Sequence, residues 1–116
     1  MAVERGGRAM AARLRVAQRT SLDLSTTGPV LAQVWRGDGG RQARLGQFLK
    51  SVDVMAVDRR LGEAGGALLG RSRGRDAVDA TLVAACHAGD RIVTGDPDDI
   101  RDLVAVSGLP ILVVPC

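Results

Sequence analysis

Short apolar runs rich in β-branched residues alternate along this chain with segments of helical periodicity. Parallel strands need long crossover connections, and helices of this kind supply them. The alternation therefore predicts an α/β fold, specifically a three-layer sandwich with a mainly parallel central sheet. The expected strands are Ser21–Thr26, Val52–Val57, Arg91–Thr94 and Ile111–Val114.

Caps and breaks divide the chain between these strands. Thr27-Gly28-Pro29 supplies a cap, a turn and a proline at the first helical position, Asp76 caps an apolar helix, and Gly89-Asp90 ends it. The segment Arg71–Arg75 is expected to be a basic loop. The expected helices are Glu4–Gln18, Pro29–Arg36, Gln42–Lys50, Asp58–Arg71, Asp76–His87 and one that opens at Asp96-Pro97.

Length and composition bound the class of protein. A chain of 116 residues predicts one domain, and a hydrophobic fraction of 46% is enough for a core. No apolar run reaches the roughly 18 residues of a membrane span, so no membrane partner is expected. Cys86 and Cys116 form neither a disulfide framework nor a metal pair, which predicts a cytoplasmic protein. Aromatic residues are only 2% of the chain, too few for base stacking on an aromatic platform.

Charge is divided unevenly along the chain. Residues 1–75 carry fourteen basic and six acidic side chains, whereas residues 76–116 carry two basic and seven acidic ones, giving net charges of +8 and −5. Blocks of one sign can simply be solvated faces. The alternative interpretation is a nuclease, in which arginines hold a polyanion and carboxylates hold a divalent cation.

Asp79 is the only charged residue between Ala77 and Cys86, and its helical neighbours Val83 and Cys86 are apolar. A buried carboxylate stays ionised only beside a cation or several hydrogen-bond donors, because desolvation otherwise raises its pKa. We interpret Asp79 as a metal ligand; the competing interpretation is a first-turn Asp stabilised by the helix dipole. Asp76 can face the same direction as Asp79, or it can act only as the N-cap.

The segment Asp96-Pro97-Asp98-Asp99 allows two interpretations. The first is a helix start, with Asp96 as cap and two acids in the first turn. The second is a carboxylate site that shares a hard cation such as Mg²⁺ with Asp79, because the segment follows a short apolar strand and ligands of parallel sheets bind at strand C-termini. His87, by contrast, lies near a helix C-terminus and is interpreted as a surface residue.

Three segments together resemble a PIN domain, and more closely the VapC-type toxin ribonucleases of bacterial toxin-antitoxin pairs. The similarity extends from Glu4 to Val114, in one domain over residues 1–116. The segments are Leu31-Ala32-Gln33-Val34-Trp35-Arg36-Gly37, Asp76-Ala77-Val78-Asp79-Ala80 and Ile92-Val93-Thr94-Gly95-Asp96-Pro97-Asp98-Asp99-Ile100.

The resemblance implies an endoribonuclease that depends on Mg²⁺ or Mn²⁺ and cuts structured RNA of the tRNA or rRNA class. It also implies a cognate antitoxin that silences the enzyme, and a homodimer is expected. Of the family's four acidic positions, the third falls on Asp79 and the fourth on Asp96, which are the expected catalytic residues. Asp98 is expected as a further metal ligand, with Gln33, Asp76 and Asp99 as auxiliary residues, and the residues expected to bind RNA are Arg36, Arg71, Arg73 and Arg75.

Two of the four acidic positions differ from the family pattern. The acid of the helix motif is replaced by Gln33, which can coordinate through oxygen but brings no charge. The first acid belongs to an opening strand that is missing here, so the domain is expected to be N-terminally truncated and the upstream reading frame to encode that strand. Because affinity for a hard dication follows the charge of its ligands, we expect weak binding of Mg²⁺.

Two functions other than an active ribonuclease follow from the same residues. One is a catalytically silent PIN remnant that binds only an antitoxin, itself or RNA. The other is a basic nucleic-acid-binding protein without chemistry, which leaves the acidic last third of the chain unexplained.

Overall fold

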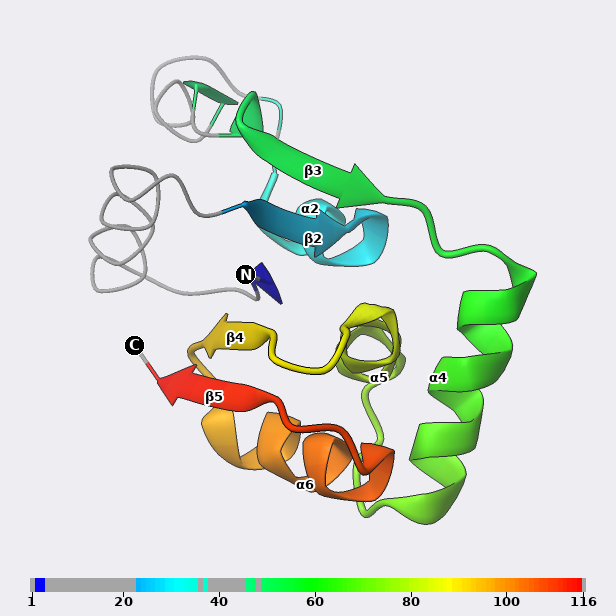
Figure 1. Cartoon of the computed structure of the whole chain (residues 1–116). Helices are drawn as coiled ribbons and strands as arrows, with labels where there is room; N and C mark the ends of the chain where they lie inside the picture. Colours follow the sequence, from blue (N-terminus) through cyan, green and yellow to red (C-terminus); the bar gives the residue numbers. More distant parts are fainter. Residues whose placement is uncertain (1, 4–22, 36, 38–45, 48, 116) are drawn as a thin grey trace.

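The backbone is an α/β arrangement whose strands run parallel to one another (Figure 1). This computed structural model describes residues 2–3, 23–35, 37, 46–47 and 49–115. In that part of the chain five strands form one sheet in the order β3-β2-β1-β4-β5. They are β1 (Ala2–Val3), β2 (Leu24–Thr27), β3 (Val52–Met55), β4 (Arg91–Thr94) and β5 (Leu112–Pro115).

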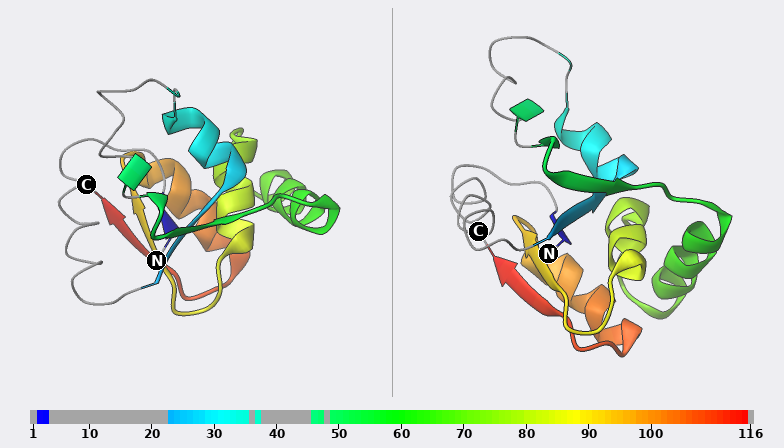
Figure 2. Two further views of the ribbon diagram at one scale, coloured as in Figure 1. Left: turned by 90° about the horizontal axis from the view of Figure 1, so that it is seen from above. Right: turned by 45° about the horizontal axis from the view of Figure 1, so that its top comes forward.

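The two-residue strand β1 lies at the centre of the sheet, between β2 and β4 (Figure 2). Ala2 is level with Ser25 of β2 on one side and with Ile92 of β4 on the other. The sequence predicts no strand ahead of Ser21 and an opening strand that is missing, whereas the structure places Ala2–Val3 in the sheet, so this part of the fold prediction is corrected. A parallel ladder needs only backbone N–H and C=O groups, so two residues without any strand-like pattern can join the pairs β3-β2 and β4-β5.

The described helices match the expected segments closely. Pro29 lies in the first turn of α2 as predicted, and Asp58 caps α4 by accepting a hydrogen bond from the backbone N–H of Leu61 at 2.9 Å. The helix predicted over 4–18, and most of that over 42–50, lie outside the described residues. The described helices are α2 (Gly28–Val34), α4 (Arg59–Arg71), α5 (Ala77–Ala85) and α6 (Pro97–Ser107).

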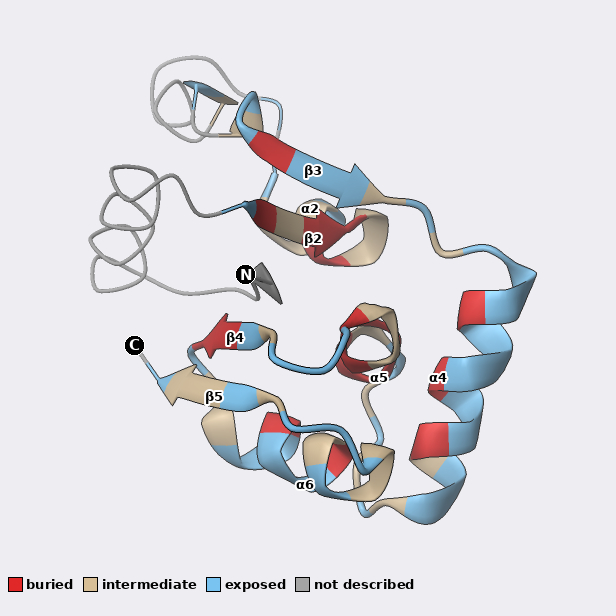
Figure 3. Ribbon diagram, viewed as in Figure 1, coloured by how far each residue is buried: buried red, intermediate tan, exposed pale blue. Residues whose placement is uncertain are grey.

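Helix α5 is the centre of the helical packing. It lies between α4 and the strands (Figure 1), and the buried residues of α4 lie on the side that faces it (Figure 3). A Cβ atom added to Gly65 of α4 would come within 3.2 Å of the backbone of Thr81, so the two helices approach almost to backbone contact. Among the described helices, none has both the length and the apolar character needed to cross a membrane.

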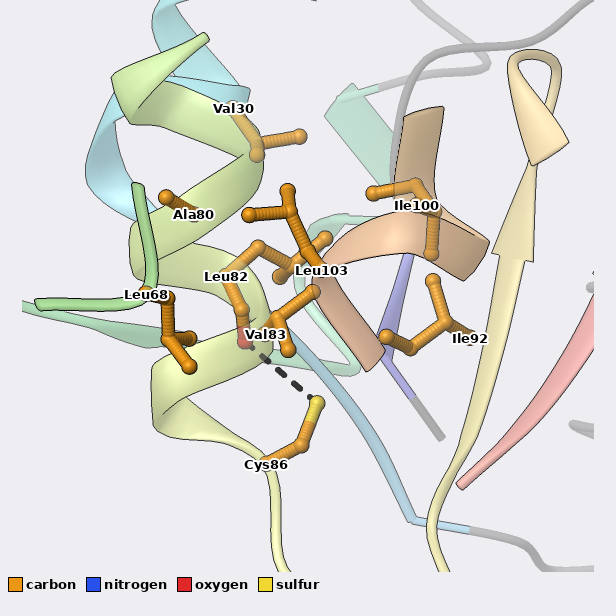
Figure 4. Packing of buried hydrophobic residues seen from close by; sticks show 9 residues of the cluster. All are labelled: Val30, Leu68, Ala80, Leu82, Val83, Cys86, Ile92, Ile100 and Leu103. Atoms are coloured by element: carbon orange, nitrogen blue, oxygen red, sulfur yellow. Dashed lines mark hydrogen bonds between the residues drawn. The ribbon is translucent and has the colours of Figure 1, made fainter. Parts of the chain in front are cut away.

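The hydrophobic core joins these helices to strand β4. Ile92 of β4 and Ile100 of α6 are both fully buried, and Leu82 of α5 packs beside them (Figure 4). Burying each such side chain contributes about 1.5–3 kcal/mol. The core therefore fixes the end of β4, the start of α5 and the start of α6 relative to one another, and these are the segments that carry the acidic residues.

Candidate metal centre

The start of α5 holds two aspartates in different roles. Oδ1 of Asp76 accepts hydrogen bonds from the backbone N–H groups of Val78, at 2.8 Å, and Asp79, at 3.2 Å. Asp76 is therefore the N-cap of the helix. Asp79 lies in the first turn with only 2% of its surface exposed, where the positive end of the helix dipole favours its negative charge.

The turn from β4 into α6 positions a third aspartate. The backbone N–H of Asp96 donates a hydrogen bond to Oγ1 of Thr94 at 2.9 Å, and Thr94 is completely buried at the end of β4. Asp96 stands at the N-cap position of α6, but its side chain makes no capping hydrogen bond. Its carboxylate therefore does not cap α6, in contrast to that of Asp76, which caps α5.

Asp79, Asp96 and Asp99 form an acidic cluster, which we call the aspartate triad. One carboxylate oxygen from each residue lies within 4.8 Å of the oxygens of the other two. Asp79 is buried, Asp96 is half-buried and Asp99 is exposed, so the cluster opens from the core to the surface. The sequence predicts that Asp79 and Asp96 share a cation, and the structure places their carboxylates close together.

The triad has the electrostatics of a cation site. The negative charge of Asp96 is the main cause that raises the pKa of Asp99 above its ordinary value, with smaller contributions from burial, from a hydrogen bond with Asp96 and from Asp102 and Asp98. A neighbouring like charge disfavours the ionised form of the Asp99 carboxyl. A divalent cation between the Asp96 and Asp99 carboxylates would remove that repulsion.

The structure places Asp99, rather than Asp98, beside Asp79 and Asp96. Asp98, predicted as a ligand, is exposed and pairs with Arg101 at 3.3 Å, whereas Asp99, predicted as auxiliary, joins the triad. Residues three apart share a helix face and residues two apart do not. Asp99 therefore lies on the same face of α6 as Asp96, whereas Asp98 lies on a different face.

Two other residues of the predicted site, Gln33 and Arg36, are not part of the triad. Gln33 is half-buried in α2, and its Oε1 atom is buried without a hydrogen bond from the described residues. Arg36 lies outside the described residues. Neither observation places these residues in the triad.

A cleft of about 560 Å³ adjoins the triad and carries charges of both signs. Its lining includes Asp79 and Asp99 of the triad together with Arg73 and Arg75 of the loop between α4 and α5. Arg71, which was also expected to bind RNA, is exposed but does not line this cleft. The cleft thus brings carboxylates suited to a cation next to guanidinium groups suited to a phosphate.

Sequence reasoning missed the residues that position this site. Thr94 holds the backbone of Asp96, and Ser72 accepts a hydrogen bond from the backbone N–H of Gly74 at 3.1 Å within the arginine loop. Both are turns in which a hydroxyl accepts from the residue two positions on. The patterns Thr-x-Asp and Ser-x-Gly were visible in the sequence and could have been used.

Two further residues whose side chains can take part in catalysis, Cys86 and His87, lie outside the triad. Burial is the main cause that raises the pKa of the Cys86 thiol to about 12, and its Sγ donates to the carbonyl of Leu82 at 3.3 Å. Cys86 is therefore a core residue and a poor nucleophile. His87 is exposed and lies 3.9 Å from the carboxylate of Asp90, as expected for a surface residue.

Comparison of the chain with protein-family models, with curated proteins and with solved structures finds no match in any of the three. Function is therefore inferred from the three sequence segments and from the geometry of the triad and its cleft.

Proposed function

We propose that the chain is a metal-dependent endoribonuclease of the PIN type, similar to the VapC toxins, and that the aspartate triad is its metal centre. The proposal rests on the proximity of the Asp79 and Asp96 carboxylates. The resemblance assigns these two residues to the same cation, and their carboxylate oxygens lie within 4.8 Å of each other.

The donor set fits Mg²⁺ or Mn²⁺. Hard divalent cations prefer oxygen ligands, and the triad offers three carboxylates. Because these oxygens all lie within 4.8 Å of one another, one cation bound between them could contact all three residues. The uncharged Gln33 stands where the family has an acid, so we keep the prediction of weak Mg²⁺ binding.

The residues of the site would have different roles in phosphodiester hydrolysis. A bound divalent cation supplies positive charge for the scissile phosphate and activates a water molecule. Asp79, at the start of α5, and Asp96, which follows the end of β4, would hold that cation. Asp99 completes the set from the surface. Arg73 and Arg75, which line the same cleft, would orient the substrate phosphates, which adds positioning to charge neutralisation.

The fold and the partners follow from the same proposal. The parallel order with a central N-terminal strand is compatible with a PIN-like three-layer sandwich. A toxin of this class acts in the cytoplasm on tRNA or rRNA, forms a homodimer and is silenced by a cognate antitoxin. The charge asymmetry of the sequence supports a polyanionic substrate.

A second candidate function is a catalytically silent PIN remnant that binds an antitoxin, itself or RNA. The replacement of the family's helix-motif acid by Gln33 favours it, because this removes one charge from the metal site. A basic nucleic-acid-binding protein is a weaker alternative, since it gives no reason for three aspartates to converge beside the arginine loop.

The test is cleavage of folded tRNA and rRNA fragments by the purified chain in Mg²⁺, in Mn²⁺ and in excess EDTA. The proposal predicts cleavage that appears with either cation and disappears with EDTA. Cleavage that persists in EDTA would exclude the metal mechanism. Heat release on titration with Mg²⁺, without any cleavage, would favour the silent remnant.

A further inference from the structure

We propose that the loop Arg71–Arg75 forms a phosphate-binding wall, in which Arg73 and Arg75 hold consecutive phosphates of a single-stranded stretch of RNA. The choice of RNA rests on the proposed function. Recognition of a phosphodiester backbone rests on the loop itself and on the cleft that it lines.

The backbone of this loop is held in place at several points. The N–H of Ser72 donates to the carbonyl of Leu69 at 3.3 Å, and the N–H of Gly74 donates to Oγ of Ser72. A Cβ atom added to Gly74 would lie 3.5 Å from Cδ2 of Leu103, so the loop packs against α6. At its far end the loop runs into the capping residue Asp76. Two arginines are thus presented from a fixed support.

Burial alternates along the loop. Arg71, Arg73 and Arg75 are exposed, whereas Ser72 and Gly74 between them are half-buried. Two residues of chain span at most about 7 Å, so the Cα atoms of Arg73 and Arg75 are no farther apart than that. This is comparable to the separation of neighbouring phosphates in an extended nucleic-acid strand. Each planar guanidinium can therefore meet one phosphate with paired hydrogen bonds.

Both arginines are available to an anion from outside. Although they share the cleft with Asp79 and Asp99, neither forms an ion pair within the described part of the chain. By contrast, Arg59 on the preceding helix pairs with Glu63 at 2.8 Å. Exposed, unpaired guanidinium groups beside a cation site are an arrangement that suits a phosphodiester.

The size and lining of the cleft suit a short single-stranded stretch of RNA. A volume of about 560 Å³ is that of a site for a drug-sized ligand, which corresponds to one or two nucleotides of a single strand. No aromatic side chain occurs among the described residues that line it. Contacts to the backbone must then supply most of the affinity, which makes binding tolerant of sequence and sensitive to salt.

The experiment measures binding of a short labelled single-stranded RNA by fluorescence anisotropy, in EDTA, over a series of salt concentrations. EDTA removes metal binding and cleavage from the readout. We expect Arg73→Ala and Arg75→Ala each to reduce the slope of log affinity against log salt by about 0.7, and the double variant by about 1.4. Arg60→Ala, an exposed arginine of α4 that does not line the cleft, should leave the slope unchanged.

Competition experiments and melting curves complete the test. Circular dichroism melts should show that all variants fold, because the substituted side chains are exposed. Unlabelled single-stranded RNA should compete better than an RNA duplex of the same length. Equal slope changes in Arg60→Ala and Arg73→Ala, or equal competition by duplex, would overturn the proposal.

The outcomes also separate this proposal from the proposed function. Metal-dependent cleavage with unchanged slopes in the Arg73 and Arg75 variants would overturn the phosphate wall and leave the metal centre intact. Reduced slopes without cleavage under any metal condition would support the phosphate wall and contradict the ribonuclease.

Discussion

Oδ1 of Asp76 accepts a hydrogen bond from the backbone N–H of Asp79 at 3.2 Å. One acid of the site therefore fixes the position of another. The carboxylate of Asp76 is used by the helix backbone, and that of Asp79 takes part in the aspartate triad. Two aspartates that look equivalent in the sequence should consequently respond differently to substitution.

Asp76→Ala should lower the free energy of unfolding by about 0.5–2 kcal/mol, because the first turn of α5 loses its cap. Asp76→Ser should restore most of that stability, since serine is also a good N-cap. Chemical denaturation measures the stability, and calorimetric titration with Mg²⁺ measures the site. If Asp76→Ser restored stability but not Mg²⁺ binding, Asp76 would be a ligand rather than a positioning residue.

Gly65→Ala should destabilise the protein by about 1–3 kcal/mol. The new Cβ would lie 2.7 Å from Cγ2 of Thr81 and 3.2 Å from the Thr81 backbone, and backbone atoms cannot rotate away. Gly66→Ala is the matched control, because nothing lies within 4 Å of its Cβ position, and it should gain up to about 1 kcal/mol from helix propensity. Urea denaturation of both variants checks this. Similar stabilisation by both would show that α4 and α5 do not pack this closely.

Asp99→Asn should raise the melting temperature in EDTA at neutral pH. The pKa of Asp99 is raised in the folded protein, chiefly by Asp96, so the repulsion is absent at low pH and grows as pH rises through that pKa. The variant and the unmodified protein should therefore converge on acidification. Thermal melts between about pH 3 and 8 measure this.

In Mg²⁺ the unmodified protein should have a higher melting temperature than Asp99→Asn, the opposite of the order in EDTA. The unmodified protein should gain more stability from Mg²⁺ than Asp99→Asn does, because the variant lacks one charged ligand. Asp102→Asn, an exposed acid of the same helix outside the triad, should keep the full gain. An equal gain in all three proteins would exclude Asp99 from the cation site.

The parts of the fold that depend on local chemistry could be predicted. The bounds Arg91–Thr94 of β4 agree with the sequence prediction, because an apolar β-branched run between turn signals has few alternatives. The cap at Asp76 was predicted for a similar reason. The meeting of Asp79 with Asp96 followed from the rule that ligands gather at the C-terminal ends of parallel strands.

The parts that depend on tertiary contacts could not be predicted. Ala2–Val3 becomes the central strand through backbone pairing alone, which leaves no side-chain pattern to detect. The choice of Asp99 over Asp98 depends on the exact phase of the first turn of α6. The position of Arg73 and Arg75 beside the triad depends on packing of their loop against Leu103.

The most direct test of the metal centre is cleavage of RNA in Mg²⁺ by Asp79→Asn. Asparagine keeps the shape of the side chain but removes the charge that holds the cation, so cleavage should fall to the level seen in EDTA. The melting temperature in EDTA should stay the same or rise, because a buried charge has been removed. His87→Ala, an exposed residue outside the triad, should cleave like the unmodified protein. Full activity of Asp79→Asn together with an inactive His87→Ala would contradict the metal mechanism and require a general acid-base ribonuclease in its place.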